Sequence, residues 1–155
     1  MKLRHMIQVG IITDNLQASI QEFQKFGFEE WKPMAFDSTR LPGILIDGSA
    51  ENTLSLDIAV FNDENMEIEL IQPLSEGVFM DWLKEHGTSI HHLAFKPVDG
   101  YPAFMEEYLN LGYKNLIDVS SPDGTKGFTY LDTIKQLGFY TEVHRGEPGK
   151  PEDHE

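Results

Sequence analysis

The segments FQKFGF at residues 23–28 and YLNLGY at residues 108–113 share a pattern of an aromatic residue, a large apolar residue, glycine and a second aromatic residue. Each glycine follows a stretch with apolar residues at helical spacing, and glycine often ends a helix in the left-handed conformation. Around both segments the order strand, helix, strand, strand, strand recurs. A period of 85 residues indicates duplicated modules rather than a solenoid. We therefore predict an α+β domain built from two βαβββ modules, each too small to bury its sheet face alone.

The expected elements follow from alternation of apolar residues, helical spacing and the positions of glycine and proline. Helices are expected at residues 16–26, 78–86 and 101–111, and strands at residues 3–12, 28–34, 54–61, 66–72, 89–97, 113–119, 128–131 and 139–144.

This order divides the chain into two modules, at about residues 3–74 and 88–145, within one domain of residues 1–146. Residues 36–53 read mostly as a loop that could cover a substrate, with a short extended piece at residues 44–46. Residues 147–155 hold two prolines and four acidic residues, and we expect a flexible acidic tail there.

Composition excludes several classes of function. The 155 residues include 12 Lys and Arg against 26 Asp and Glu, a formal net charge of −14, and the cations are scattered, which argues against a general nucleic-acid binder. No apolar run approaches the ~18 residues that cross a bilayer, and the amino terminus lacks the features of a signal peptide. The chain has no cysteine, so any metal must be held by His, Asp, Glu, Asn or Gln. We expect a cytoplasmic protein that binds neither nucleic acid nor membranes.

Side chains alternate between the two faces of a strand, and this separates the two adjacent histidines of residues 89–97. His91 shares its face with Leu93 and Phe95, which is a face that packs under helices. His92 shares its face with the small Ala94, which leaves room for a ligand. His92 is therefore the candidate for a functional role.

Three further polar residues project from strand faces with small or polar neighbours, namely Gln8, Glu69 and Glu142. In the first module, Gln8 lies on the first strand and Glu69 on the last. In the second module, His92 lies on the first strand and Glu142 on the last. Two modules related by a pseudo-twofold axis would bring all four side chains to one place. One nitrogen and three oxygen donors, two of them carboxylates, make a chemically sensible octahedral site for a divalent ion.

Each of these residues also has a structural explanation. A pair of histidines in a strand is more often structural than metal-binding, Glu69 lies among acidic neighbours where a solvated role is common, and Glu142 could pair with Arg145 or Lys126. The agreement of four residues in face and module position favours a shared metal site over four separate roles. Three other histidines are expected to be surface groups: His5, His144 and His154.

Several segments resemble the vicinal oxygen chelate proteins. QVGI at residues 8–11 with NLQAS at residues 15–19 resembles the opening of that family, and MEIELIQPL at residues 66–74 resembles the strand of its second ligand. GTSIHHLAF at residues 87–95 resembles the segment of methylmalonyl-CoA epimerases in which the second histidine binds metal. GFYTE at residues 138–142 resembles the closing strand. The resemblance spans about residues 3–145 and implies paired βαβββ modules in a cup-shaped mixed sheet.

The resemblance also implies one divalent metal ion, Zn²⁺, Ni²⁺ or Co²⁺, on Gln8, Glu69, His92 and Glu142. Epimerases typically have histidine where this chain has Gln8, and the set of Gln, Glu, His and Glu resembles the zinc set of some glyoxalase I enzymes. In both activities the metal polarises a substrate carbonyl while a carboxylate moves a proton through an enediolate. By analogy the catalytic base is Glu142 or Glu69. Asp57 is a weaker candidate, for which a role as an edge-strand polar residue is favoured.

The leading functional prediction is a metal-dependent isomerase or lyase that resembles methylmalonyl-CoA epimerase. Its substrate would be an acyl thioester, with Arg40 as a possible contact for an anionic part, although the lack of a basic cluster argues against CoA itself. The first alternative is a lactoylglutathione lyase (glyoxalase I) acting on a hemithioacetal. A ring-cleaving dioxygenase needs two histidines and a carboxylate, which Gln8 argues against.

Two alternative predictions are proteins without enzymatic activity. One is a small-molecule-binding protein of the bleomycin-resistance type, and the other is an α+β domain without a metal. Proteins of the first kind usually lack the metal ligands, so four plausible donors argue against it. We also expect a homodimer, because family members are commonly dimers and the sheet edges favour self-association.

Overall fold

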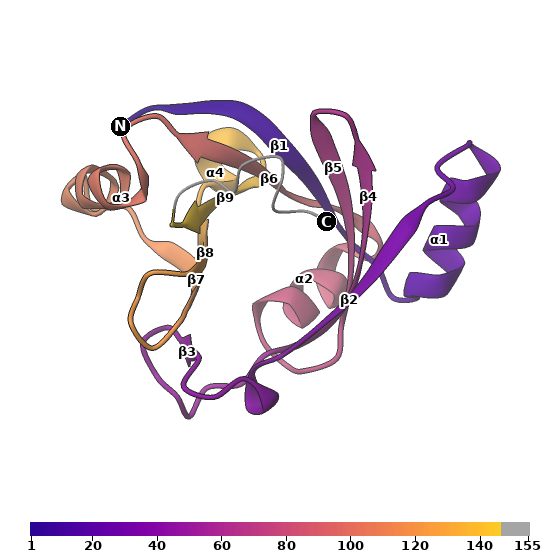
Figure 1. Cartoon of the computed structure of the whole chain (residues 1–155), viewed down its shortest axis with the longest axis horizontal. Helices are drawn as coiled ribbons and strands as arrows, with labels where there is room; N and C mark the ends of the chain where they lie inside the picture. Colours follow the sequence, from indigo (N-terminus) through magenta and orange to yellow (C-terminus); the bar gives the residue numbers. More distant parts are fainter. Residues whose placement is uncertain (147–155) are drawn as a thin grey trace.

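The computed structural model describes residues 1–146, so the tail predicted at residues 147–155 lies outside the described residues (Figure 1). The helices are α1 (Leu16–Lys25), α2 (Val78–His86), α3 (Tyr101–Asn110) and α4 (Ile134–Leu137). The strands are β1 (Leu3–Ile12), β2 (Trp31–Asp37), β3 (Leu45–Ile46), β4 (Ser55–Asp63), β5 (Met66–Pro73), β6 (Ser89–Pro97), β7 (Asn115–Ser120), β8 (Gly127–Leu131) and β9 (Tyr140–Arg145).

These strands form one mixed sheet in the order β2-β4-β5-β1-β6-β9-β8-β7-β3. Its two halves meet where β1 pairs antiparallel with β6. In each half the first strand also pairs parallel with the last, β1 with β5 and β6 with β9. The prediction of an α+β fold with two βαβββ units is confirmed. The pairing makes β5, β1, β6 and β9 the four central strands, and these carry the four candidate metal ligands.

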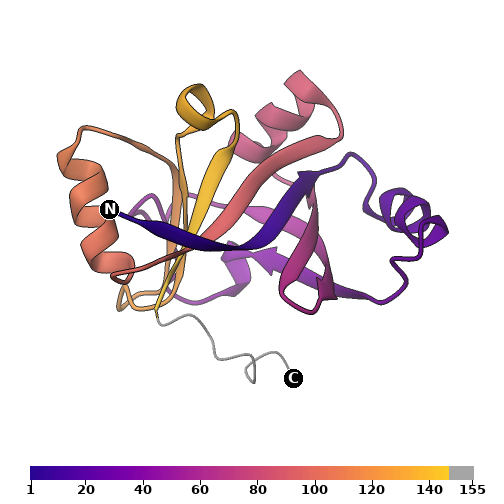
Figure 2. The same cartoon turned by 90° about the horizontal axis from the view of Figure 1, so that it is seen from above.

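The sheet curls into a cup, which Figures 1 and 2 show from two directions. Phe36 of β2 and Phe128 of β8 lie far apart in the sheet order, yet their ring centroids are 5.9 Å apart. A core of buried apolar side chains likewise draws on β4 and β7 together. The curl buries apolar area that a flat sheet would expose, which is the main favourable contribution to folding. The buried members of this core are Ile12, Ile46, Leu54, Leu56, Ile58, Val60, Ile71, Phe79, Ile117, Val119 and Tyr130.

The helices cover the outside of the cup and the join between its halves. Phe104 and Tyr108 of α3 pack on Leu131 and Val143 in a second core cluster. Helix α1 begins with a side-chain cap, in which Asn15 accepts a hydrogen bond from the backbone N–H of Ala18. Among residues 1–146, no helix combines the length and apolar character needed to cross a bilayer.

Some element boundaries differ from those expected. The strand predicted at residues 28–34 begins at Trp31, because Phe28 completes the end of α1. The backbone N–H of Phe28 donates to the carbonyl of Phe23, and Gly27 between them has a positive φ of 94°. Helix α4 was not predicted, because four residues are too few for helical spacing to be recognised.

The loop expected at residues 36–53 is partly ordered structure. It contains the end of β2, a 3₁₀ turn (Ser38–Arg40) and β3, which pairs with β7 and forms one edge of the sheet. Ile46, within this segment, and Leu54, directly after it, are buried in the main core. The segment therefore closes the far side of the cup.

Candidate metal centre

The register of the four central strands brings the four candidate ligands to the concave side of the cup. Gly10 of β1 lies opposite Glu69 of β5 on one side and opposite His92 of β6 on the other. On the next strand, Glu142 of β9 pairs with Ala94 of β6. Because cross-strand partners point to the same face, these residues share one face of the sheet.

Gly10 makes room for the imidazole ring of His92. A Cβ atom built at Gly10 would overlap Cε1, Nε2 and Nδ1 of that ring, so the ring lies directly over the backbone of β1. A side chain at this position would displace His92. The glycine is thus part of the site, although the sequence indicated only that it was a small neighbour of Gln8.

Nε2 of His92 lies at the centre of the cluster. It is 3.3 Å from Oε1 of Gln8, 3.4 Å from Oε2 of Glu69 and 3.3 Å from Oε2 of Glu142. All four residues are buried, with exposed fractions of 6% for Gln8, 9% for Glu69, 0% for His92 and 4% for Glu142. Among residues 1–146, Oε2 of Glu69 and Oε2 of Glu142 form no hydrogen bond apart from these contacts with Nε2 of His92. Two buried carboxylates that share one ring nitrogen need a positive charge between them.

The ionisation of the cluster shows how that charge is supplied without a metal. Burial raises the pKa of Glu69, and the neighbouring Glu142 adds to the effect. Burial would raise the pKa of Glu142 as well, but His144 and His92 hold it below its usual range. Burial would lower the pKa of His92, yet the contacts of its Nε2 with the carboxylates of Glu142 and Glu69 raise that pKa to about 9. An imidazolium at His92 therefore balances the carboxylates when no cation is bound.

Two residues, His91 and Glu67, support the cluster from outside. Nδ1 of His91 lies 3.1 Å from Nδ1 of His92. Nε2 of Gln8 donates to Oε2 of Glu67 over 3.1 Å, which turns the amide oxygen of Gln8 towards His92. Amide orientation is assigned from such hydrogen bonds. Partners of this kind orient the atoms that a metal would contact.

His91 and His144 occupy different environments. His91 is fully buried among aromatic rings, including Phe79 and Trp82 of α2, as its apolar strand face predicted. His144 is exposed, as expected of a surface group, and its Nε2 also lies 3.2 Å from Oε1 of Glu142. Its position two residues after Glu142 places it on the same strand face. That alternation was the available signal for its role.

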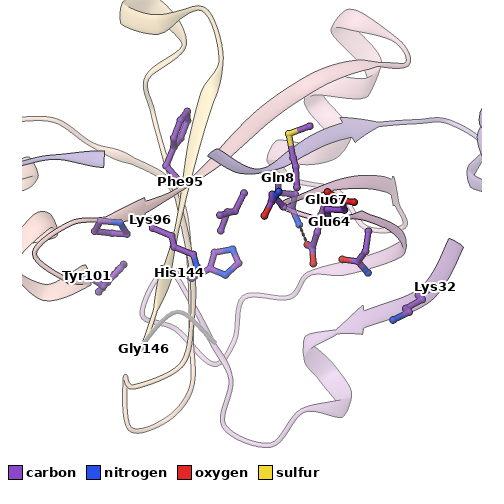
Figure 3. Close-up of a pocket in the computed structure, with 15 residues that line it drawn as sticks. Gln8, Lys32, Glu64, Glu67, Phe95, Lys96, Tyr101, His144 and Gly146 are labelled. Atoms are coloured by element: carbon purple, nitrogen blue, oxygen red, sulfur yellow. Dashed lines mark hydrogen bonds between the residues drawn. The ribbon is translucent and has the colours of Figure 1, made fainter. Parts of the chain in front are cut away.

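A cavity of about 580 Å³ opens beside the cluster (Figure 3). Gln8, Glu67 and His144 line it, whereas Glu69, His92 and Glu142 are not among its described lining residues. Its volume is in the range of small-molecule sites, ~300–1,000 Å³. The other residues along its walls are Ile7, Lys32, Asn62, Glu64, Asn65, Met66, Phe95, Lys96, Pro97, Gly100, Tyr101 and Gly146.

Two weaker candidates from the sequence lie away from this cavity. Asp57 alternates with Leu56 and Ile58, which point into the main core, so it faces the opposite side of β4 from the cluster. It is not an edge-strand residue either, because β4 lies between β2 and β5. Arg40 has a side chain that is 86% exposed and pairs with Asp37 at 3.3 Å.

The structure also bears on the ion pair considered for Glu142 and on the cover expected at residues 36–53. Arg145 forms an ion pair with Asp118 at 2.7 Å, and the side chain of Glu142 contacts His92 and His144 instead. The proposed cover at residues 36–53 contributes Phe36, Ile44 and Ile46 to the main core, and none of the described residues lining the cavity comes from it. The cations that line the cavity are Lys32 and Lys96, which the sequence did not single out.

Comparison with known proteins identifies the family. Residues 7–131 match the profile of the Glyoxalase/Bleomycin resistance protein/Dioxygenase superfamily. The chain belongs to this superfamily. The resemblance to vicinal oxygen chelate proteins is thereby confirmed. A comparison with curated proteins gave no match.

Several solved structures share the fold over nearly the whole chain. A variant of methylmalonyl-CoA epimerase from Streptomyces coelicolor, in complex with 2-nitronate-propionyl-CoA, has a TM-score of 0.66 at 20% identity and covers 96% of this chain and 99% of its own. Methylmalonyl-CoA epimerase from Mycobacterium tuberculosis has a TM-score of 0.60 at 16% identity, with 94% and 90% covered. A hypothetical protein from Bacillus halodurans has a TM-score of 0.64 at 17% identity, with 97% and 99% covered. At these identities the comparison establishes the fold alone.

Proposed function

We propose that this superfamily member is a metal-dependent isomerase or lyase that acts through an enediolate, and that Gln8, Glu69, His92 and Glu142 hold one divalent ion. The observation that carries the proposal is the convergence of two buried carboxylate oxygens and the amide oxygen of Gln8 on Nε2 of His92, where a single N–H faces three oxygens. A structural cluster would be expected to give each buried carboxylate its own hydrogen-bond donor.

The residues fit a divalent ion in number, type and charge. Glu69, His92 and Glu142 offer ligand atoms that all lie within 4.8 Å of one another, and the amide oxygen of Gln8 adds a fourth donor. Imidazole with carboxylate and amide oxygens suits Zn²⁺, Ni²⁺ or Co²⁺. Bound there, such an ion supplies Lewis-acid stabilisation of negative charge on a carbonyl oxygen. The family resemblance assigns proton transfer to Glu142 or Glu69.

The cavity supports a small anionic substrate. Lys32 and Lys96 both line it, and they offer two ammonium groups to a carboxylate or similar group. The solved epimerases that share this fold make an acyl thioester the first substrate to test. The second substrate to test is a hemithioacetal, because the set of Gln, Glu, His and Glu resembles the zinc ligands of some glyoxalase I enzymes. Both substrates carry a carbon-bound proton that a neighbouring carbonyl activates.

Metal content is the first test, measured by elemental analysis on protein without a polyhistidine tag. We expect about one ion per chain after reloading with Zn²⁺, Ni²⁺ or Co²⁺, and loss of tight binding in His92→Ala. The loaded protein is then incubated in D₂O with methylmalonyl-CoA or with the hemithioacetal of methylglyoxal and glutathione, and proton NMR follows exchange or isomerisation. Absence of binding after reloading would overturn the proposal and favour a non-catalytic binder on the same fold.

A further inference from the structure

Glu67 differs from the other carboxylates near the cluster because it faces the cavity. Of the described residues that line the cavity, two carry carboxylates, Glu64 and Glu67. Glu64 lies in the turn between β4 and β5, whereas Glu67 lies on β5 and accepts a hydrogen bond from Gln8. Glu67 thus links the candidate metal ligands to the space that a substrate would occupy (Figure 3).

Glu69 and Glu142 are less well placed to reach a substrate. Both are buried behind the cavity wall, and their oxygens converge on Nε2 of His92. Glu142 is held further by His144 at 3.2 Å. In the proposed metal-bound state their charges would neutralise the ion. Moving either carboxylate to a substrate would leave that charge unbalanced in a buried site.

Glu67 carries none of these constraints. It forms no ion pair with any residue of the described chain, and its one side-chain hydrogen bond comes from the neutral amide of Gln8. The carboxylate of Glu67 lies beside the amide nitrogen of its cross-strand partner Gln8, whose oxygen is turned towards the cluster. A base at Glu67 would therefore act on a substrate whose carbonyl lies near the cluster and whose neighbouring carbon lies in the cavity.

We propose that Glu67 is the catalytic base of the reaction proposed above. Its carboxylate contacts the substrate in the cavity and accepts the proton from the carbon beside the carbonyl. The C–H bond breaks, its electron pair stays on the substrate as the enediolate, and the proton moves to an oxygen of Glu67. The proton then returns to the substrate from Glu67, or is first replaced by a deuteron from solvent. No oxidant or further reactant is needed. The inference rests on the proposed function.

Glu67→Gln separates this role from support of Gln8. Glutamine keeps an oxygen that can accept the hydrogen bond from Gln8, but it cannot take a proton. Glu51→Gln is the matched control, because it removes a carboxylate from an exposed residue that is not among the described lining of the cavity. With whichever of the two substrates the wild type turns over, we expect Glu67→Gln to lower kcat for solvent deuterium incorporation by about 10²-fold to 10⁴-fold, the usual contribution of a positioned base. KM should change little, and Glu51→Gln should exchange at close to the wild-type rate.

Metal binding provides a readout that does not depend on turnover. Loaded with Co²⁺, Glu67→Gln should bind one ion per chain and keep the visible absorption spectrum of the wild type, because none of the proposed ligands is changed. Wild-type exchange in Glu67→Gln, or loss of its metal, would overturn the role as base. A wild-type protein that binds metal yet exchanges no proton of either substrate would instead overturn the proposed function and this inference with it.

Discussion

Gly10 and His92 are cross-strand partners at the junction of the two halves, and the imidazole ring of His92 lies where a Cβ at position 10 would be. We therefore predict that Gly10→Ala displaces the ring from Glu69 and Glu142. Such overpacking typically costs about 1–3 kcal/mol. Metal affinity should fall as well, because Nε2 of His92 would leave the centre of the cluster. Chemical unfolding and Zn²⁺ titration measure the two effects.

A double-mutant cycle provides the control for Gly10→Ala. His92→Ala removes the ring, so adding Gly10→Ala to that variant should cost much less stability than it does in the wild type. Equal costs in the two backgrounds would show that the alanine acts through the backbone of β1 rather than through the ring of His92.

The sequence predicted the four candidate ligands because module order and strand alternation are local properties. Gln8 and His92 lie on the first strands of their modules. These two strands pair at the junction of the halves, which brings the two side chains together. The cavity could not be predicted, since its walls depend on how far the sheet curls. The role of Glu67 was hidden for the same reason, although it shares a strand face with Glu69. β3 lies within the short extended piece expected at residues 44–46, but its pairing with β7, which is distant in the sequence, could not be predicted from two residues.

The pH dependence of metal binding follows from His92. Its pKa is raised to about 9 in the metal-free protein, and a metal needs the unprotonated Nε2. Below pH 9 we expect each bound ion to displace one proton from His92, so that affinity rises up to about tenfold per pH unit and levels off above pH 9. Calorimetry in buffers of different ionisation enthalpy counts the protons released. An affinity that stays constant between pH 6 and pH 9 would contradict this assignment.

The stability of the metal-free protein should depend on pH in the opposite direction. A folded-state pKa of about 9, above the ordinary value of 6.5, means that protonated His92 favours the folded state. This contribution is fully present below pH 6.5 and is lost as the pH rises through 9. The free energy of unfolding of the metal-free protein should therefore fall across this interval. The same decline should be absent from His92→Ala, which serves as the control.

His91 is predicted to fix the proton on the other nitrogen of His92. Burial lowers the pKa of His91 to about 2, so it is neutral and its Nδ1 can accept a hydrogen bond from Nδ1–H of His92. That leaves Nε2 of His92 free for a metal. His91→Phe fills much of the same space without an acceptor. We expect it to lower Zn²⁺ affinity about 10-fold to 100-fold, the usual effect of losing such a partner. His91→Ala should in addition cost about 2–5 kcal/mol of stability through the cavity it leaves.

His144 is predicted to hold Glu142 in place without contributing much to folding. Its side chain is 47% exposed, so little packing is lost in His144→Ala. The variant removes the contact at Oε1 of Glu142 that leaves Oε2 directed at His92. Metal affinity should therefore fall by about 10-fold to 100-fold, while the free energy of unfolding of the metal-free protein changes little. Zn²⁺ titration and chemical unfolding separate the two, with His5→Asn as a control at an exposed histidine of β1. Unchanged affinity in His144→Ala would make His144 a surface residue, as its sequence position alone suggested.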